Sequence, residues 1–197
     1  MITMKNIVRE GHPSLSRKAQ ELACPLSEHD RNTLREMREF LINSQEEDMA
    51  EKYALRPGVG LAAPQINLSK RMLAIYTLDE NFEELHDYLM VNPRIISHSE
   101  AKTYMPGGEG CLSVDREVTG LVPRYKKVTV QTNLYHADTD TLTETTLRLK
   151  GIVSIVFQHE LDHLNGILFT ERVKLELPEL NPLEFKSIEE NNKEEDL

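Results

Sequence analysis

The chain has 197 residues, with 23 basic and 33 acidic side chains and a formal charge of −10 at pH 7. This length is enough for one domain whose core needs no disulfides. The acidic balance argues against a nucleic-acid binder or a binder of anionic membranes, because those proteins need basic side chains to neutralise phosphates. We therefore expect a single domain over residues 1–197 that binds neither nucleic acid nor a membrane.

The two ends of the chain and its two cysteines indicate the compartment. The first residues lack the apolar core of a signal peptide, and no apolar run has the length needed to cross a bilayer. Cys24 and Cys111 lie far apart, so we expect no disulfide framework and a reducing cytoplasm. Cys24 is expected to be a buried, inert side chain. Acidic residues crowd the end of the chain, where we expect a solvated or frayed tail from about residue 186.

Two helices are predicted in the first quarter of the chain. The first covers residues 13–23, in which apolar positions recur at spacings of three and four. The second begins after Ser27, which is a suitable N-cap residue, and its buried stripe comprises Leu34, Met37 and Leu41. The region that follows is rich in glycine and proline, so it cannot continue a helix.

Strands dominate the middle of the chain. Runs with strand composition cover residues 72–77, 88–97 and 128–134, and a turn at 138–140 leads into a further run that ends at residue 149. The order is helices, then strands, then one last helix. This order predicts an α+β fold with mainly antiparallel sheets packed around a central helix.

The last helix carries a His-Glu-x-x-His motif. His159 and His163 are four residues apart, so on a helix both imidazoles leave the same face and can grip one metal ion. Glu160 lies next to them and can take a proton from a metal-bound water. Gly151 marks the start of this helix, and Gly166 is placed as its C′ residue. The competing interpretation is an amphipathic helix with two hydrogen-bonded polar histidines.

A catalytic zinc-like site uses three protein ligands and leaves one position open for water. Cys111 follows a glycine-rich stretch that allows close approach of the backbone, so we favour its thiolate as the third ligand. The alternative is a zinc endopeptidase of the His-Glu-x-x-His type that takes its third ligand from a downstream glutamate. The candidates for that role are Glu171, Glu176, Glu179 and Glu184. A metal-stabilised binding module without catalysis is a third possibility.

The segment Gly58–Gln65 opens with a Gly-x-Gly pattern. The sixth position is Ala63 rather than glycine, and Pro64 follows it, so no helix with free N–H groups is expected to begin there, which argues against a phosphate-binding loop. We expect a tight bend that brings backbone N–H groups and the Gln65 carboxamide to a substrate carbonyl. A plain turn between a helix and a strand is the alternative.

Three segments of the chain, taken together, resemble the signature motifs of the peptide deformylases. They are Gly-x-Gly-x-Ala-Ala-Pro-Gln at 58–65, Glu-Gly-Cys-Leu-Ser at 109–113 and Gln-His-Glu-x-Asp-His-Leu-x-Gly at 158–166. The resemblance extends from about residue 4 to residue 172. The insertion at 43–56 resembles the class of this family that is common in Gram-positive bacteria. The acidic tail has no counterpart in it.

The resemblance implies a site of known composition. The metal ligands would be Cys111, His159 and His163, holding one divalent ion, with Fe²⁺ expected natively and Zn²⁺, Ni²⁺ or Co²⁺ able to substitute. Glu160 would be the general base and acid, and Gln65 with the backbone N–H of Leu112 would stabilise the oxyanion. The expected substrate-binding residues are Gly58, Val59, Gly60, Gly110, Ile152, Val156 and Arg124.

Some of these substrate-binding roles have alternatives. Ile152 and Val156 can line a slot for a methionine side chain or simply pack in the core. Arg116 and Arg124 can orient peptide carbonyls or pair with Glu109. The activity that the resemblance implies is a metal-dependent hydrolase that removes the N-formyl group from the formylmethionine of newly made polypeptides and releases formate. Such an enzyme would be a cytoplasmic monomer that works near the ribosome. Because the last residues given are acidic, we expect no docking through the long basic C-terminal helix that some family members use there.

Overall fold

The computed structural model describes residues 1–186, which contain three α-helices, seven strands and three short 3-10 helices. The mixture of helices with antiparallel strands confirms the predicted α+β fold. Residues 187–197 lie outside the described residues, and with them most of the acidic tail expected from about residue 186. No helix within the described part has the length and apolar character needed to cross a membrane.

Five strands form one antiparallel sheet in the order β1-β2-β3-β6-β7. Their bounds are β1 Gly60–Ala62, β2 Met72–Leu78, β3 Leu85–His98, β6 Lys127–His136 and β7 Thr141–Lys150. Two short strands, β4 Lys102–Thr103 and β5 Arg124–Tyr125, pair as a second small sheet. The predicted strands and their antiparallel pairing are therefore confirmed.

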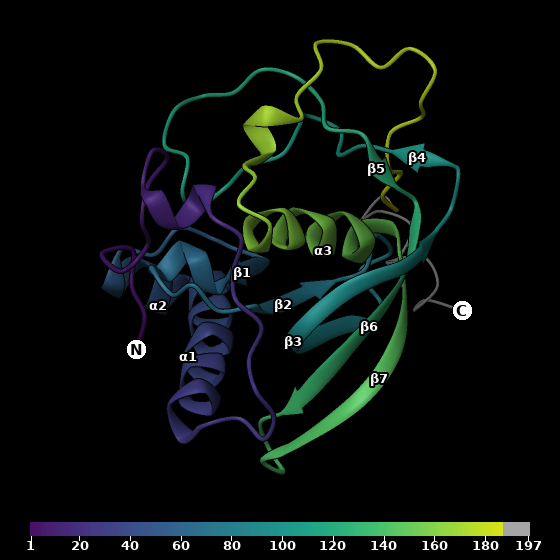
Figure 1. Ribbon diagram of the computed structural model, residues 1–197. Coiled ribbons are helices and arrows are strands. Elements are labelled where there is room, and N and C mark those ends of the chain that lie inside the picture. The colour runs from purple at the N-terminus through teal and green to yellow at the C-terminus, as the bar shows by residue number, and fades with distance from the viewer. Residues whose placement is uncertain (187–197) are drawn as a thin grey trace, which may run out of the picture.

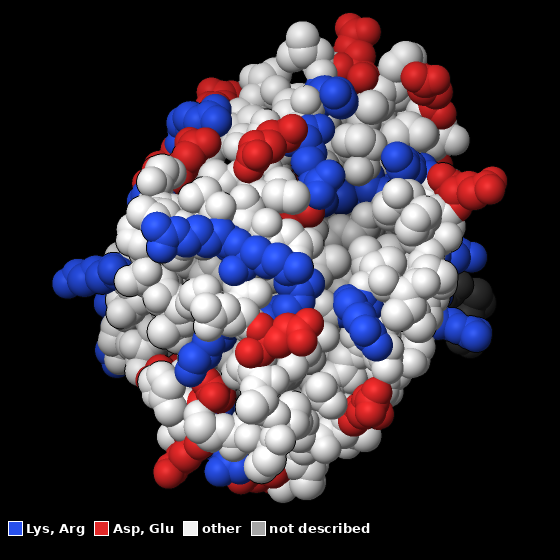
Figure 2. Space-filling model, in the orientation of Figure 1, with Lys and Arg blue, Asp and Glu red and all other residues white. Residues whose placement is uncertain are grey.

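Helix α1, Glu28–Gln45, covers one face of the large sheet. The Ser27 hydroxyl caps it by accepting the Asp30 N–H at 3.1 Å, as predicted. Its stripe of Leu34, Met37 and Leu41 is fully buried and belongs to the same apolar cluster as Met72, Ala74, Leu89 and Val91 of the sheet. A short helix, α2 Glu47–Tyr53, follows. On the face of the molecule shown in Figure 2, Lys and Arg side chains lie beside Asp and Glu side chains.

The prediction of a helix over residues 13–23 is wrong, because only Pro13–Ser16 form a short 3-10 helix. The remaining residues use their backbone groups in contacts with distant segments. The Ala19 N–H donates to the Leu164 carbonyl at 2.9 Å, and the Gln20 carbonyl accepts the Arg71 N–H at 2.7 Å. Helical hydrogen bonds within residues 13–23 would require the same groups.

The buried environment predicted for Cys24 is also wrong, because this side chain is exposed. It lies in the irregular segment between the 3-10 helix and α1. The expectation rested on the general tendency of free cysteines to be buried, which this position does not follow.

Helix α3, Gly151–Leu164, packs on the opposite face of the sheet from α1 and lies between the large sheet and the β4–β5 pair (Figure 1). Its start is fixed by Glu80, whose carboxylate accepts the Ile152 N–H at 3.2 Å. Its end is fixed at Gly166, which adopts φ +73°, while the N–H of Ile167 bonds the Asp162 carbonyl at 2.9 Å. The predicted ends of this helix are thus confirmed, and the helix is a firmly held support.

Candidate metal centre

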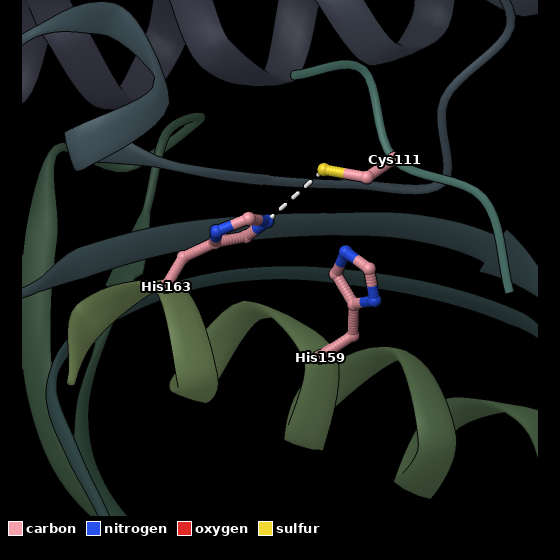
Figure 3. Close-up of side chains that lie close together, drawn as sticks. All are labelled: Cys111, His159 and His163. Carbon is pink, nitrogen blue, oxygen red and sulfur yellow. Dashed lines mark hydrogen bonds between the residues drawn. The ribbon is translucent and has the colours of Figure 1, made fainter. Parts of the chain in front are cut away.

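Three predicted ligands converge beside α3. The candidate donor atoms of Cys111, His159 and His163 lie within 4.8 Å of one another, and all three residues are buried. The Cys111 Sγ is 3.3 Å from the His163 Nε2. Figure 3 shows one ring nitrogen of each histidine turned towards the sulfur. A thiolate with two imidazoles is a donor set that suits a divalent transition ion.

The two histidines differ in protonation. Burial lowers the pKa of His163 well below its usual value, and the neighbouring His159 lowers it further, so the ring stays neutral. Its Nδ1 has no partner in the described part of the chain. The Nδ1 of His159 lies 2.9 Å from the Glu109 Oε2 and donates to it. The Nε2 of His159 faces the sulfur (Figure 3). Burial lowers the pKa of His159, but hydrogen bonds with Cys111 and Glu109 outweigh that effect and raise this pKa well above its usual value, so the ring holds a proton that a bound metal ion would displace.

The neighbours of Glu109 keep its carboxylate ionised. Burial raises its pKa, but Arg124 and His159 outweigh that effect and lower the pKa of Glu109 to about 2. The Arg124 guanidinium grips this carboxylate with two bonds of 2.9 Å, and its Nη1 donates to Asp162 at 2.5 Å. Arg172 in turn binds Asp162 at 2.6 and 2.7 Å. A chain of alternating charges thus runs from the surface to a metal ligand.

The position of Arg124 decides between the two roles considered for it, contact with a substrate and pairing with Glu109. The side chain is only 3% exposed and pairs with Glu109. Glu109 lines the open cavity described below but Arg124 does not, so the expectation that Arg124 contacts a substrate is not supported. Its alternative, the pairing with Glu109, is what the structure has.

Glu160 lies beside the ligands with one carboxylate oxygen, Oε2, unpaired among the described residues. Burial raises the pKa of Glu160 to about 7, so the group can both accept and return a proton near neutrality. Its other oxygen lies against the α-carbon of Gly60. A Cβ at position 60 would come within 2.4 Å of the Glu160 Oε1. The sequence therefore needs a glycine there for Glu160 to reach this position.

The segment that carries Gln65 differs from the predicted tight bend. Residues 60–62 are edge strand β1, and Ala63–Ile66 form a 3-10 helix, η2. The Ala62 N–H donates to the Gln65 Oε1 at 2.8 Å, which fixes the carboxamide. Its NH₂ group therefore points to the Cys111 Sγ at 3.6 Å and the Ser113 Oγ at 3.4 Å.

A cavity of about 260 Å³ opens next to the ligands. It is lined by six of the seven expected substrate residues: Gly58, Val59, Gly60, Gly110, Ile152 and Val156. Five further lining residues were not predicted, namely Arg56, Pro57, Met105, Gly108 and Ile155. Ile155 could have been found, because it lies one helical turn after Ile152. No local pattern singles out Met105.

The downstream glutamates do not join this site. Glu171, Glu176, Glu179 and Glu184 are all exposed, and within residues 1–186 the metal-ligand cluster comprises only Cys111, His159 and His163. Glu171 instead accepts the Leu168 N–H at 2.9 Å. An endopeptidase that takes its third ligand from these glutamates is therefore not favoured.

Residues 4–178 match the family described as polypeptide deformylase. A relative from Bacillus cereus named peptide deformylase 2 is 52% identical over 189 residues, which cover 96% of this chain and 100% of the relative. A peptide deformylase from Staphylococcus epidermidis is 54% identical over 178 residues, covering 90% of this chain and 94% of the relative.

Solved structures agree with these similarities. The crystal structure of peptide deformylase from Thermus thermophilus aligns with a TM-score of 0.64 at 31% identity, covering 86% of this chain and 85% of that one. A class I type b peptide deformylase from Acinetobacter baumannii aligns with a TM-score of 0.64 at 29% identity, covering 85% of this chain and 97% of that one.

Proposed function

The chain belongs to the polypeptide deformylase family, and we propose that it removes the N-formyl group from newly made polypeptides and releases formate. Its relatives from Bacillus and Staphylococcus agree with the Gram-positive class. The observation that carries the proposal is the convergence of Cys111, His159 and His163 next to Glu160 at one end of a cavity.

The three ligands fit one divalent metal ion, and we propose Fe²⁺ as the native ion, with Zn²⁺, Ni²⁺ or Co²⁺ able to substitute. When bound, such an ion supplies Lewis acidity, which makes a water acidic and polarises a carbonyl. Once the ion displaces the proton on His159, a deprotonated thiol and two neutral imidazoles can hold any of these ions. The Glu109 carboxylate supports this role because it fixes the ring of His159.

Glu160 handles the proton in this proposal. Its unpaired oxygen can accept a proton from the attacking water, because burial brings its pKa close to neutrality. It can then give that proton to the amine that leaves with the new N-terminus. Gly60 contributes by leaving the space in which this carboxylate lies.

Gln65 and Leu112 are proposed to stabilise the negative charge that develops on the formyl oxygen. The Gln65 NH₂ group is directed at the ligand sulfur by the bond between its Oε1 and Ala62. No residue in the range 1–186 accepts a hydrogen bond from the Leu112 N–H, and Leu112 lines the cavity. Two fixed donors of this kind favour the transition state over the ground state.

The cavity supplies the substrate contacts. We propose that the apolar side chains of Ile152, Ile155 and Val156 contact the methionine side chain. Strand β1 is an edge strand, and its first residue, Gly60, lines the cavity together with Gly58, Val59 and Gly110. An extended peptide can pair with such an edge through its backbone.

Several finer expectations stay proposals. A single catalytic domain is supported by one family match that spans residues 4–178. A cytoplasmic location and a site of action near the ribosome follow from the nature of the substrate, which is a nascent chain. The monomeric state and the absence of nucleic-acid binding stay predictions from the sequence.

Turnover of formyl-Met-Ala by anaerobically prepared, Fe²⁺-loaded protein tests the proposed function. We expect the Glu160→Ala variant to keep the ion and the fold, while its kcat falls by about 10³-fold, because the group that moves the proton is missing. Metal content is measured on the same samples. A wild-type protein that holds its ion but leaves the formyl group in place would contradict the function. Cleavage of internal bonds in an unformylated peptide would favour an endopeptidase.

A further inference from the structure

The peptide unit between Cys111 and Leu112 is held from its carbonyl side. The Cys111 oxygen accepts two hydrogen bonds, from the Arg56 Nη2 at 3.2 Å and from the Val114 N–H at 3.2 Å. A trans peptide is planar, and its C=O and N–H point in opposite directions. Any group that fixes the Cys111 carbonyl therefore also fixes the direction of the Leu112 N–H.

Arg56 is itself held in place. Its Nη1 donates to the Asp115 Oδ1 at 2.7 Å, and the other oxygen of Asp115 accepts the Arg9 Nε at 2.8 Å. Arg9 also donates to the Ile7 carbonyl at 2.5 Å. The planar guanidinium of Arg56 is thus bound at two of its nitrogens, one to a carboxylate and one to the peptide unit. A flexible single-point contact would not fix an orientation in this way.

The segment that contains Arg9 joins both proposed oxyanion donors. The Val8 N–H donates to the Gln65 carbonyl at 2.8 Å, and the Glu10 N–H donates to the Ser113 carbonyl at 2.8 Å. Residues 8–10 therefore bridge the segment that carries Gln65 and the segment that carries Leu112. Through Asp115, the same short stretch also restrains Arg56.

We infer that Arg56 is a positioning residue for deformylation, which orients the Leu112 N–H towards the developing negative charge on the formyl oxygen. This inference rests on the proposed function. Two physical effects act together. The hydrogen bond to the Cys111 carbonyl fixes the peptide plane, and it polarises the same peptide unit, which makes its N–H a stronger donor. Asp115 and Arg9 serve by keeping the guanidinium in the required plane.

Kinetics of the Arg56→Ala variant provide the first part of the test. We expect kcat to fall about 10-fold while KM changes by less than about twofold, because the misdirected donor acts in the transition state. The metal content and the melting temperature should stay near the wild-type values, since Arg56 is 45% exposed and its ion pair is at the surface. In Arg56→Lys, one ammonium replaces the two-point fork, so we expect kcat to stay low.

Arg116→Ala is the matched control. Arg116 carries the same charge and lies four residues after Leu112, but it pairs with Glu10 at 2.8 Å and does not contact the Cys111 carbonyl. We expect this variant to keep the wild-type kcat. Equal losses of kcat in Arg116→Ala and Arg56→Ala would show that the loss of a positive charge is enough to explain the effect, and would overturn the inference.

The chemical shift of the Leu112 amide is a second measurement, and it does not depend on turnover. In Zn²⁺-loaded protein followed by NMR, we expect this resonance to move in Arg56→Ala and Arg56→Lys and to stay in place in Arg116→Ala. An unmoved resonance with unchanged kcat would overturn the inference while leaving the deformylase activity intact. A rise in KM alone would overturn it too, by making Arg56 a substrate contact. Failure of the proposed function would differ, because the wild type itself would then be inactive.

Discussion

The two faces of α3 are buried to a similar extent but are held in different ways. One face is apolar, with Val153, Phe157 and Leu164 packed in the same cluster as the sheet. The other carries His159 and His163, which are also buried. The apolar side chains need only a matching surface, because their burial is favourable in itself. The polar ones need chosen partners, because a buried polar group without a hydrogen bond costs free energy.

On the polar face, some buried groups have hydrogen-bond partners and others do not. His159 has Glu109 as a partner, and Glu109 has Arg124, so this part of the face is fully paired. Glu160 and His163 each keep one buried atom, Oε2 and Nδ1, without a partner among residues 1–186. The apolar face therefore sets the position of the helix, and the rigid helix then holds polar groups whose burial is unfavourable. Unpaired atoms of this kind concentrate at functional sites.

The largest change is expected on the apolar face. Phe157 is fully buried against the sheet, so Phe157→Ala should lower the free energy of unfolding by about 3–5 kcal/mol through lost burial and a new cavity. Urea denaturation of the metal-free protein measures this. Activity per folded, metal-loaded molecule should change little, because Phe157 does not line the cavity. A loss below about 1 kcal/mol would contradict the division between the two faces.

A smaller change is expected on the polar face. Glu109→Gln keeps the shape of the side chain but removes the charge that binds Arg124 and orients His159. Metal affinity should fall about 10- to 100-fold, as is typical when a ligand loses its orienting partner. Competition with a chelator of known affinity measures this. Glu171→Gln is the matched control, since that carboxylate is exposed and bonds the Leu168 N–H. Unchanged affinity in Glu109→Gln would show that His159 needs no such partner.

Local patterns in the sequence were enough to predict the supports of the site. The spacing of His159 and His163 placed both on one face of a helix, and Gly166 marked its end. Ser27 marked the start of α1, and alternating apolar residues marked the strands. In each case the deciding interaction lies within a few residues of the chain, so the sequence carries it directly.

What could not be predicted depends on residues that are distant in the chain. Residues 13–23 have a helical pattern, but Ala19 and Gln20 form backbone bonds with remote segments. Arg124 was one candidate among several for substrate contact, and only the fold shows that Asp162 and Glu109 hold it. The positions of such groups are set by how elements pack, which no local spacing encodes.

Metal content per folded chain, compared between Cys111→Ala and Cys24→Ala, tests most directly whether a thiolate completes the site. The chain has two cysteines, and only Cys111 lies beside the histidines, while Cys24 is exposed. We predict about one divalent ion per chain in the wild type and in Cys24→Ala, and almost none in Cys111→Ala at unchanged fold, because two imidazoles alone bind weakly. A folded Cys111→Ala protein that still retains a full ion per chain would contradict the site proposed above.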